Sequence, residues 1–220
     1  MRIGILGSGL IGGKLGAIFA RAGHHVVFSY SRSRQKLARL ARDAGANARA
    51  GTPAEATQDA DAVLLAVHWT RVDDVLAQAG TLAGKVVLTC SLPMSKDDSR
   101  LVVGHTTSGA EALAAKIRRG HVVSAFSTVP IEVLFRVFEG RGKGSRPDLV
   151  YCGDDEGARR TAARLIRDAG FRPVDLGPLS AARYVEPFSL LLAHLAYNGA
   201  DGPELAYRFE RFKKRRTHSR

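Results

Sequence analysis

Three glycines near the N-terminus have the spacing of a turn that can bind a pyrophosphate. The segment reads Gly7-Ser8-Gly9-Leu10-Ile11-Gly12 and lies between an apolar run and an alanine-rich helical stretch. In such a turn the first glycine allows the sharp bend, the second lets backbone amides approach the phosphates, and the third lets the helix pack on the strand. The helix N-terminus adds unpaired N–H donors. A purely structural glycine turn is the alternative, but the order of strand, turn and helix favours a dinucleotide site.

The residues after the second apolar run favour NADP(H) over NAD(H). NAD-binding versions of this turn place an acidic residue about twenty residues beyond the glycines, where it binds the ribose 2′-hydroxyl. Here the run ends instead in Tyr30, Ser31 and Arg32, and Lys36 follows one helical turn later. A hydroxyl, a guanidinium and an ammonium suit a 2′-phosphate. The alternative is that Arg32 and Lys36 are solvated charges, although basic residues at a helix start oppose the helix dipole.

The chain offers no convincing set of residues for nucleophilic, acid–base or metal catalysis. Cys90 and Cys152 each end an apolar run and are expected to be buried, reduced thiols. The chemistry that a bound NADP(H) supplies is hydride transfer, which needs no such set, because the protein mainly aligns two planar rings and excludes water. His68 and His105 could donate a hydrogen bond to a reduced, anionic ring, or they could be ordinary polar residues at a strand or loop end.

The apolar periods predict alternating strands and helices over the first 130 residues. Strands are expected at 2–6, 25–30, 46–50, 62–67, 86–90 and 121–126, and helices at 10–22, 33–44, 53–57, 72–79 and 109–117. Ser108 and Glu111 have the capping-box spacing, and Gly23 and Gly45 are placed to end helices. This alternation predicts a Rossmann-type, doubly wound α/β fold with a parallel sheet, whose ligands bind at the carboxyl ends of the strands.

A small C-terminal α/β extension is expected after Pro130. Its predicted elements are a helix at 131–138, a surface turn at 139–147, a strand at 148–152, a helix at 156–169, a strand at 172–175 and an apolar helix at 180–198 that Pro187 should kink. We therefore expect an NADP-binding domain over 1–130, a smaller lobe over 131–207 and a disordered basic tail over 208–220. The apolar helix needs cover from a second subunit or a ligand, so a homodimer is predicted.

Composition and charge set the broad class of the protein. Of the 220 residues, 45% are hydrophobic and 25% are charged, as in an ordinary soluble domain. No apolar run reaches the ~18 residues that a membrane span needs, so a cytoplasmic protein without a membrane partner is predicted. The net charge is +12, and residues 208–220 hold half of it. Such a tail can bind nucleic acid, but a solvated terminus is the commoner case and is the interpretation preferred here.

Several longer segments resemble the coenzyme F420-dependent NADP oxidoreductases. This family shares a nucleotide fold with pyrroline-5-carboxylate reductases and with the oxidoreductase domain of STEAP metalloreductases. The likeness lies in Ser31-Arg32, Trp69, the run 122–130, the run 152–155 and the segment 177–180 with Arg183 and Glu186. Two places depart from the family pattern, namely His68, where a proline is expected, and the segment 93–107.

The resemblance implies an enzyme that passes a hydride between NADP(H) and a deazaflavin (coenzyme F420) or a flavin-like acceptor. The alternatives are an NADPH-dependent reductase of another small substrate, such as an imine or a ferric chelate, and a non-enzymatic NADPH-binding protein. The predicted cofactor-binding residues are Gly7, Ser8, Gly9, Leu10, Ile11, Gly12, Tyr30, Ser31, Arg32, Lys36, Val67, His68, Trp69 and Ala125. The residues expected near the second substrate are Ser91, Pro93, Met94, Ser127 and Asn198.

Overall fold

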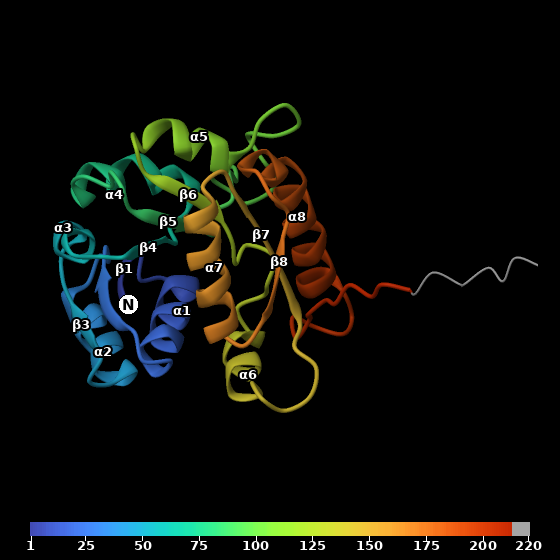
Figure 1. Cartoon of the computed structure of the whole chain (residues 1–220), viewed down its shortest axis with the longest axis horizontal. Coiled ribbons are helices and arrows are strands. Elements are labelled where there is room, and N and C mark those ends of the chain that lie inside the picture. Colours follow the sequence, from blue (N-terminus) through green and yellow to red (C-terminus); the bar gives the residue numbers. More distant parts are fainter. Residues whose placement is uncertain (213–220) are drawn as a thin grey trace, which may run out of the picture.

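The eight strands of the computed structural model form one sheet in the order β3-β2-β1-β4-β5-β6-β7-β8 (Figure 1). The structure describes residues 1–212. All neighbouring strands in it are parallel except β6 and β7. The direction of winding reverses between β1 and β4, as in a doubly wound sheet. The predicted Rossmann-type α/β fold is therefore confirmed.

Each predicted strand and helix is present, with bounds that differ by a few residues. The strands are β1 (Arg2–Leu6), β2 (His25–Ser29), β3 (Ala48–Ala50), β4 (Ala62–Leu65), β5 (Val86–Thr89), β6 (His121–Ser124), β7 (Asp148–Gly153) and β8 (Arg172–Asp175). The helices are α1 (Leu10–Arg21), α2 (Arg34–Ala44), α3 (Pro53–Gln58), α4 (Val72–Ala79), α5 (Gly109–Lys116), α6 (Val133–Glu139), α7 (Glu156–Asp168) and α8 (Ala182–Asn198). Short 3-10 helices precede α4 (Trp69–Arg71) and α8 (Leu179–Ala181).

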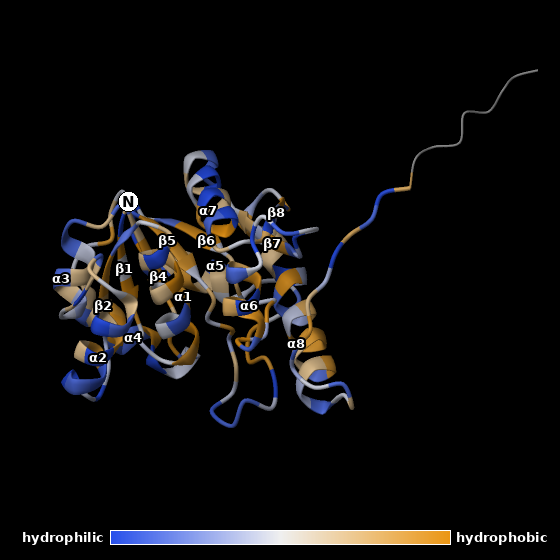
Figure 2. Ribbon diagram, turned by 90° about the horizontal axis from the view of Figure 1, so that it is seen from below, coloured by the Kyte–Doolittle hydropathy of each residue, from blue (hydrophilic) through white to orange (hydrophobic). Residues whose placement is uncertain are grey.

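Helices cover both faces of the sheet, which explains why the central strands are apolar on both sides. Leu64 of β4 packs in a core with α1, α2, α6 and α7. Its neighbours Val63 and Leu65 pack in a second core with α3, α4, α5 and α8. Figure 2 shows the same arrangement as hydrophobic strands between helices that carry many hydrophilic residues, whereas α8 is largely hydrophobic. Ligands of such sheets bind at the carboxyl ends of the strands, which the helices leave open.

The sheet continues across the predicted boundary at residue 130. Strands β6 and β7 pair only at Val123–Gly153 and Ser124–Cys152. Tyr207 from the C-terminal segment lies against the start of β7, which pairs with β8 but not with β6. The Tyr207 hydroxyl accepts a hydrogen bond from the Val150 amide at 3.0 Å. The Tyr207 carbonyl accepts a hydrogen bond from the Asp148 amide at 2.8 Å. The described part of the predicted tail, residues 208–212, continues from this contact, and residues 213–220 lie outside the described chain.

Two residues of the C-terminal motif hold α5 in place. The Glu186 carboxylate is buried and accepts hydrogen bonds from the amides of Gly109 and Ala110, each at 3.0 Å. Burial raises the pKa of Glu186. Arg183 forms a two-point ion pair with Glu111, at 2.9 and 2.6 Å. These contacts satisfy N–H groups at a helix start, so Arg183 and Glu186 contribute here to the packing of α5 against α8.

Helix α8 continues through Pro187 and exposes several apolar side chains, among them Tyr184, Leu191 and Leu195. The cysteines Cys90 and Cys152 are buried and unpaired, as predicted. Burial raises the pKa of each thiol to about 12. Within residues 1–212, no helix has the length and apolar character of a membrane span.

Candidate nucleotide-binding site

A cavity of about 710 Å³ opens at the carboxyl ends of β1, β2 and β4. Ligands of doubly wound sheets bind at this edge, where the winding reverses. The cavity brings together these predicted cofactor-binding residues: Gly7, Ser8, Gly9, Tyr30, Ser31, Arg32, Lys36, Val67 and His68.

The glycine turn has the geometry that its spacing predicts. Gly7 has a φ of +110°, and a Cβ added to it would lie 2.4 Å from the Ala66 carbonyl oxygen. A Cβ on Gly12 would lie 1.9 Å from the carbonyl oxygen of Gly7, so α1 can pack on the turn only with a glycine there. A Cβ on Gly9 would meet no atom within 4 Å. The backbone of Gly9 is therefore open to the cavity.

The N-terminus of α1 has free backbone N–H groups that can bind an anion. Its N-cap residue is Gly9, which has no side chain to accept from the first-turn amides, and α1 carries no acidic residue in that turn. The Ser8 side chain does not cap these amides either, because its hydroxyl is buried and donates to the carbonyl of Ser29 at 2.9 Å. The helix dipole and the free N–H groups thus favour a phosphate beside Gly9.

A second cationic region lies at the other end of the cavity, after β2. Arg32, Arg34 and Lys36 all line the cavity and are exposed. They lie at the start of α2, which Ser33 caps by accepting a hydrogen bond from the Lys36 amide at 3.2 Å. The positive end of this helix therefore adds to three side-chain cations. Such a concentration of positive charge suits a phosphate group with two negative charges.

An acidic side chain does enter the cavity, but from α4 rather than from β2. The Asp74 carboxylate accepts hydrogen bonds from the Tyr30 hydroxyl, from Arg71 at 3.0 Å and from Gln78 at 3.2 Å. Arg71 also donates to the Tyr30 hydroxyl at 3.1 Å. The Tyr30 hydrogen bond is the main reason that the pKa of Asp74 is lowered, while burial raises the pKa of Tyr30. Arg71 neutralises the acid, so the cavity remains cationic.

The sequence analysis did not predict that Arg71, Asp74 and Gln78 line the cavity, because the acidic residue of NAD-binding sites is expected only after β2. Only the topology of the fold points to these three residues: they lie in or next to α4, which follows β4, and β4 pairs with β1 beside the glycine turn. Tyr30 has a φ of +57°, an uncommon conformation for an aromatic residue. The hydrogen bonds to Arg71 and Asp74 fix its ring at the cavity wall.

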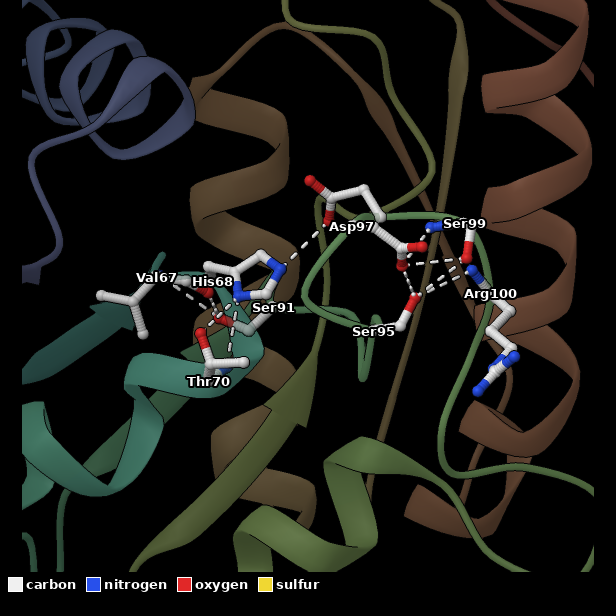
Figure 3. A network of polar contacts seen from close by, with 9 residues as sticks. Val67, His68, Thr70, Ser91, Ser95, Asp97, Ser99 and Arg100 are labelled. Carbon is white, nitrogen blue, oxygen red and sulfur yellow. Dashed lines mark hydrogen bonds and ion pairs between the residues drawn. The ribbon is translucent and has the colours of Figure 1, made fainter.

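His68 links the end of β4 to a hairpin that follows β5 (Figure 3). Its Nδ1 accepts a hydrogen bond from the Thr70 amide at 3.2 Å, and its Nε2 lies 3.1 Å from the Asp98 carboxylate. Nδ1 also lies 2.8 Å from the Thr70 hydroxyl, and because an ionised carboxylate can only accept, Nε2 is the donor in the contact with Asp98. The Nε2 atom of His68 therefore donates to Asp98 in this structure.

The hairpin that carries Asp98 runs from Met94 to Leu101, which form a β-bridge. Inside it, the Asp97 carboxylate accepts hydrogen bonds from the hydroxyls of Ser95 at 2.6 Å and Ser99 at 2.9 Å, as drawn in Figure 3. This network gives the exposed hairpin a defined shape. The hairpin therefore presents Asp98 to His68.

The other predicted residues lie outside the wall of this cavity. Ser91 fixes the end of β4 by donating to the carbonyl of Val67 at 2.7 Å. Pro93 packs beside Gly109, Ser127 contacts Ser189 at 3.2 Å, and the Asn198 amide lies 3.0 Å from His194. Leu10, Ile11, Gly12, Trp69, Met94, His105 and Ala125 also do not line it. Within residues 1–212, no group of three His, Cys, Asp or Glu residues is arranged to hold a metal ion.

The Rossmann fold and the cation-lined cavity are typical of a dinucleotide-binding protein, and comparison with known proteins agrees with this interpretation. Residues 2–93 match the family described as "NADP oxidoreductase coenzyme F420-dependent". The resemblance predicted from the motifs is confirmed over this N-terminal part, which carries the glycine turn, Arg32 and His68.

Among curated proteins, the chain is 31% identical over 191 residues to Metalloreductase STEAP3 of Rattus norvegicus, an alignment that covers 87% of this chain and 37% of the relative. It is 26% identical to Metalloreductase STEAP2 of Homo sapiens, with 86% and 36% covered. The chain thus spans a little over a third of the length of these relatives.

Among solved structures, a candidate F420-dependent NADP-reductase from Arthrobacter sp. FB24 matches with a TM-score of 0.83 and 21% identity, covering 96% of this chain and all of the other. A hypothetical protein from Sinorhizobium meliloti matches with a TM-score of 0.72 and 29% identity, covering 83% and 88%. A reductive aminase from Aspergillus terreus in complex with NADPH has a TM-score of 0.63 and 18% identity, covering 88% and 60%. The matches below 25% identity support the fold.

Proposed function

We propose that this protein passes a hydride between NADP(H) and a deazaflavin, such as coenzyme F420, or a flavin-like acceptor. The observation that carries the proposal is the 710 Å³ cavity, which joins the glycine turn, the cations after β2 and the end of β4 in one space. NADP(H) needs a cationic partner for the 2′-phosphate at one end, phosphate donors in the middle and a place for the nicotinamide at the other end.

In this proposal each part of the cavity has one task. The amides at Gly9 and the N-terminus of α1 bind the pyrophosphate. Ser31, Arg32 and Lys36 bind the 2′-phosphate, which gives the preference for NADP(H) over NAD(H). Val67 and His68, at the end of β4, lie beside the nicotinamide. NADPH supplies the hydride when it is bound, and the protein aligns the rings and excludes water.

The acceptor is proposed to bind on the side of the nicotinamide that faces the hairpin. Ser91, Pro93 and Met94 begin the segment that leads from β5 into this hairpin, and Ala125 and Ser127 follow the neighbouring strand β6. Parallel strands end at one edge of the sheet, so both segments lie on the nicotinamide side of the fold. His68 holds the hairpin through Asp98, so the hairpin forms one wall of the proposed acceptor site.

A second candidate is a reductase of another small substrate, such as a ferric chelate or an imine. The ferric chelate is favoured by the 31% identity to a protein named as a metalloreductase over 87% of this chain. The departures at His68 and 93–107 lie at the proposed acceptor site, where a change of substrate would require changes in the protein. A non-enzymatic NADPH-binding protein would share the cavity but reduce nothing.

An acceptor panel separates these candidates. The purified protein is mixed with NADPH and, in parallel reactions, with oxidised F420, FMN, a ferric chelate and a cyclic imine, and NADPH consumption is followed. The proposal expects the fastest turnover with the deazaflavin and much slower turnover with NADH. Fastest turnover with the ferric chelate or the imine would favour the second candidate, and tight NADPH binding without any turnover would favour the non-enzymatic protein.

The predicted homodimer and cytoplasmic location belong to the same proposal. The exposed apolar side chains of α8, which include Tyr184, Leu191 and Leu195, support a second subunit as the cover of this face. Light scattering on the purified protein gives the mass. A monomeric mass at all concentrations would contradict the dimer without affecting the proposed reaction.

A further inference from the structure

A second cavity, of about 770 Å³, lies between the loop before β7, the end of α7, the start of β8 and the C-terminal segment. Its wall and that of the nucleotide cavity have no residue in common among the described residues. The two sites can therefore be tested separately.

Five arginines from separate parts of the chain converge on this second cavity. Arg146 precedes β7, Arg167 lies in the last turn of α7, Arg172 begins β8, and Arg208 and Arg211 come from the C-terminal segment. Glu210 is the one acidic residue among the described lining residues. Guanidinium groups gathered in this way repel one another unless an anion lies between them.

Only two of the five arginines have a carboxylate partner within residues 1–212. Arg172 pairs with the buried carboxylate of Asp148, and Arg208 pairs with Glu210 at 3.1 Å. No ion pair within the described chain includes Arg146, Arg167 or Arg211. Five arginines against two carboxylates leave a local charge of +3.

Hydrogen bonds attach the C-terminal segment, which forms one wall of this second cavity, to the starts of β7 and β8. The Asp148 carboxylate accepts a hydrogen bond from the Phe209 amide at 2.7 Å, and Arg172 donates to the Phe209 carbonyl at 3.0 Å. Tyr207 is fixed to the start of β7 two residues earlier. The C-terminal segment is thus tied to β7 and β8, so Arg208 and Arg211 reach the cavity from an anchored backbone.

We propose that this second cavity binds a ligand that carries several phosphate groups. Planar guanidinium groups match phosphate oxygens in pairs, and phosphates provide the dense negative charge that the unpaired arginines need. The volume of about 770 Å³ accommodates more than a single inorganic phosphate. The ligand is either a free polyphosphate or the backbone of a single-stranded nucleic acid. In the second case, the exposed rings of Phe209 and Phe212 would stack on bases.

The test titrates inorganic tripolyphosphate into the full chain by calorimetry, with saturating NADP⁺ present so that the nucleotide cavity is filled. We expect saturable binding at one site, and affinity that falls as the salt concentration rises. The variant Arg146→Gln, Arg167→Gln, Arg211→Gln should bind tripolyphosphate about tenfold more weakly or worse, since it loses three charge-assisted contacts. Its affinity for NADP⁺ should be unchanged, which shows that it is folded.

The matched control is Arg39→Gln, Arg42→Gln, Arg118→Gln, which removes the same charge from exposed arginines outside both cavities. It should bind tripolyphosphate like the parent protein. Equal loss in both triple variants would overturn the proposal, because attraction would then depend only on net charge. Failure of tripolyphosphate to bind with the nucleotide cavity filled would overturn it as well.

A short single-stranded oligonucleotide distinguishes the two sources of phosphate. If the ligand is a nucleic acid, the oligonucleotide binds more tightly than tripolyphosphate, and tripolyphosphate displaces it. The Phe212→Ala substitution then weakens the binding of the oligonucleotide. If the ligand is a free polyphosphate, Phe212→Ala leaves tripolyphosphate binding unchanged and the oligonucleotide competes poorly. Both results support a phosphate site in this cavity.

Discussion

The Nε2 atom of His68 lies 3.1 Å from the carboxylate of Asp98 and joins the end of β4 to the hairpin after β5. Asp98 has a φ of +56°, so this residue adopts an uncommon backbone conformation at the contact. In the proposed function this contact fixes the hairpin beside the acceptor. His68 then acts as a positioning residue.

Asp98→Ala should weaken acceptor binding without affecting the cofactor. Loss of one hydrogen bond to the hairpin is expected to raise the KM for the acceptor about three- to tenfold, while the Kd for NADP⁺ stays the same. Steady-state kinetics and a cofactor titration measure the two effects. Asp59→Ala, an exposed acid elsewhere, serves as the control, and an unchanged KM in Asp98→Ala would exclude the positioning role.

Arg32→Ala should weaken NADP⁺ binding and leave NAD⁺ binding unchanged. The guanidinium is proposed to bind the 2′-phosphate, which NAD⁺ lacks, so the Kd for NADP⁺ should rise about 10- to 100-fold. Arg39→Ala, on helix α2 that follows Arg32 but outside the cavity, should change neither affinity. Equal losses for both cofactors would show that Arg32 does not recognise the 2′-phosphate.

Alanine at Gly9 and at Gly12 should have opposite effects on folding and binding. A Cβ at Gly12 overlaps the Gly7 carbonyl oxygen, so Gly12→Ala should destabilise the protein by about 2 kcal/mol or more. Gly9 has space for a methyl group, so Gly9→Ala should fold normally and bind NADP⁺ about tenfold more weakly, because the backbone can no longer approach the phosphates. Denaturant unfolding and cofactor titration test both; a Gly9→Ala protein with parental affinity would contradict the assignment.

Stability should fall below about pH 6.5 because of His24. This side chain is buried between the N-terminal amine and Asp168, which lie 3.4 and 3.0 Å away, and burial lowers its pKa from 6.5. The unfolded chain therefore takes up a proton at a pH where the folded chain does not. The contribution of the neutral, buried His24 to the free energy of unfolding is therefore fully present above pH 6.5. As the pH falls below this value, it is lost at up to about 1.4 kcal/mol per pH unit.

The measurement for His24 is the difference in unfolding free energy between the parent protein and His24→Gln from pH 8 to pH 5. Taking the difference removes the contributions of carboxylates, including Glu186, whose pKa is raised. The parent protein should lose stability relative to the variant as the pH falls. A constant difference would contradict the assignment.

Much of the fold could be predicted because its signals are local. The apolar runs that became β1, β4 and β5, and the glycines that end α1 and α2, act within a few residues of themselves. The glycine turn and Arg32 were found for the same reason. They are adjacent in the sequence to the strands that place them in the cavity.

The contacts that were missed join distant parts of the chain. Asp74 meets Tyr30 across 44 residues, and Asp98 meets His68 across 30, so no spacing pattern records either pair. Glu186 was noticed as part of a motif, but its partners are backbone amides of α5. Only the packing of α8 on α5 gives that residue its role.

Transfer of deuterium from NADPH that carries deuterium at both C4 positions of the nicotinamide to oxidised coenzyme F420 tests the proposed reaction most directly. The reduced deazaflavin holds the transferred atom in a C–H bond, so mass spectrometry can find it there. We predict that the label appears in the reduced deazaflavin in proportion to the NADPH consumed, and that Arg32→Ala slows this transfer at low NADPH. NADPH consumption without label in the deazaflavin, or no consumption at saturating NADPH, would contradict hydride transfer to this acceptor.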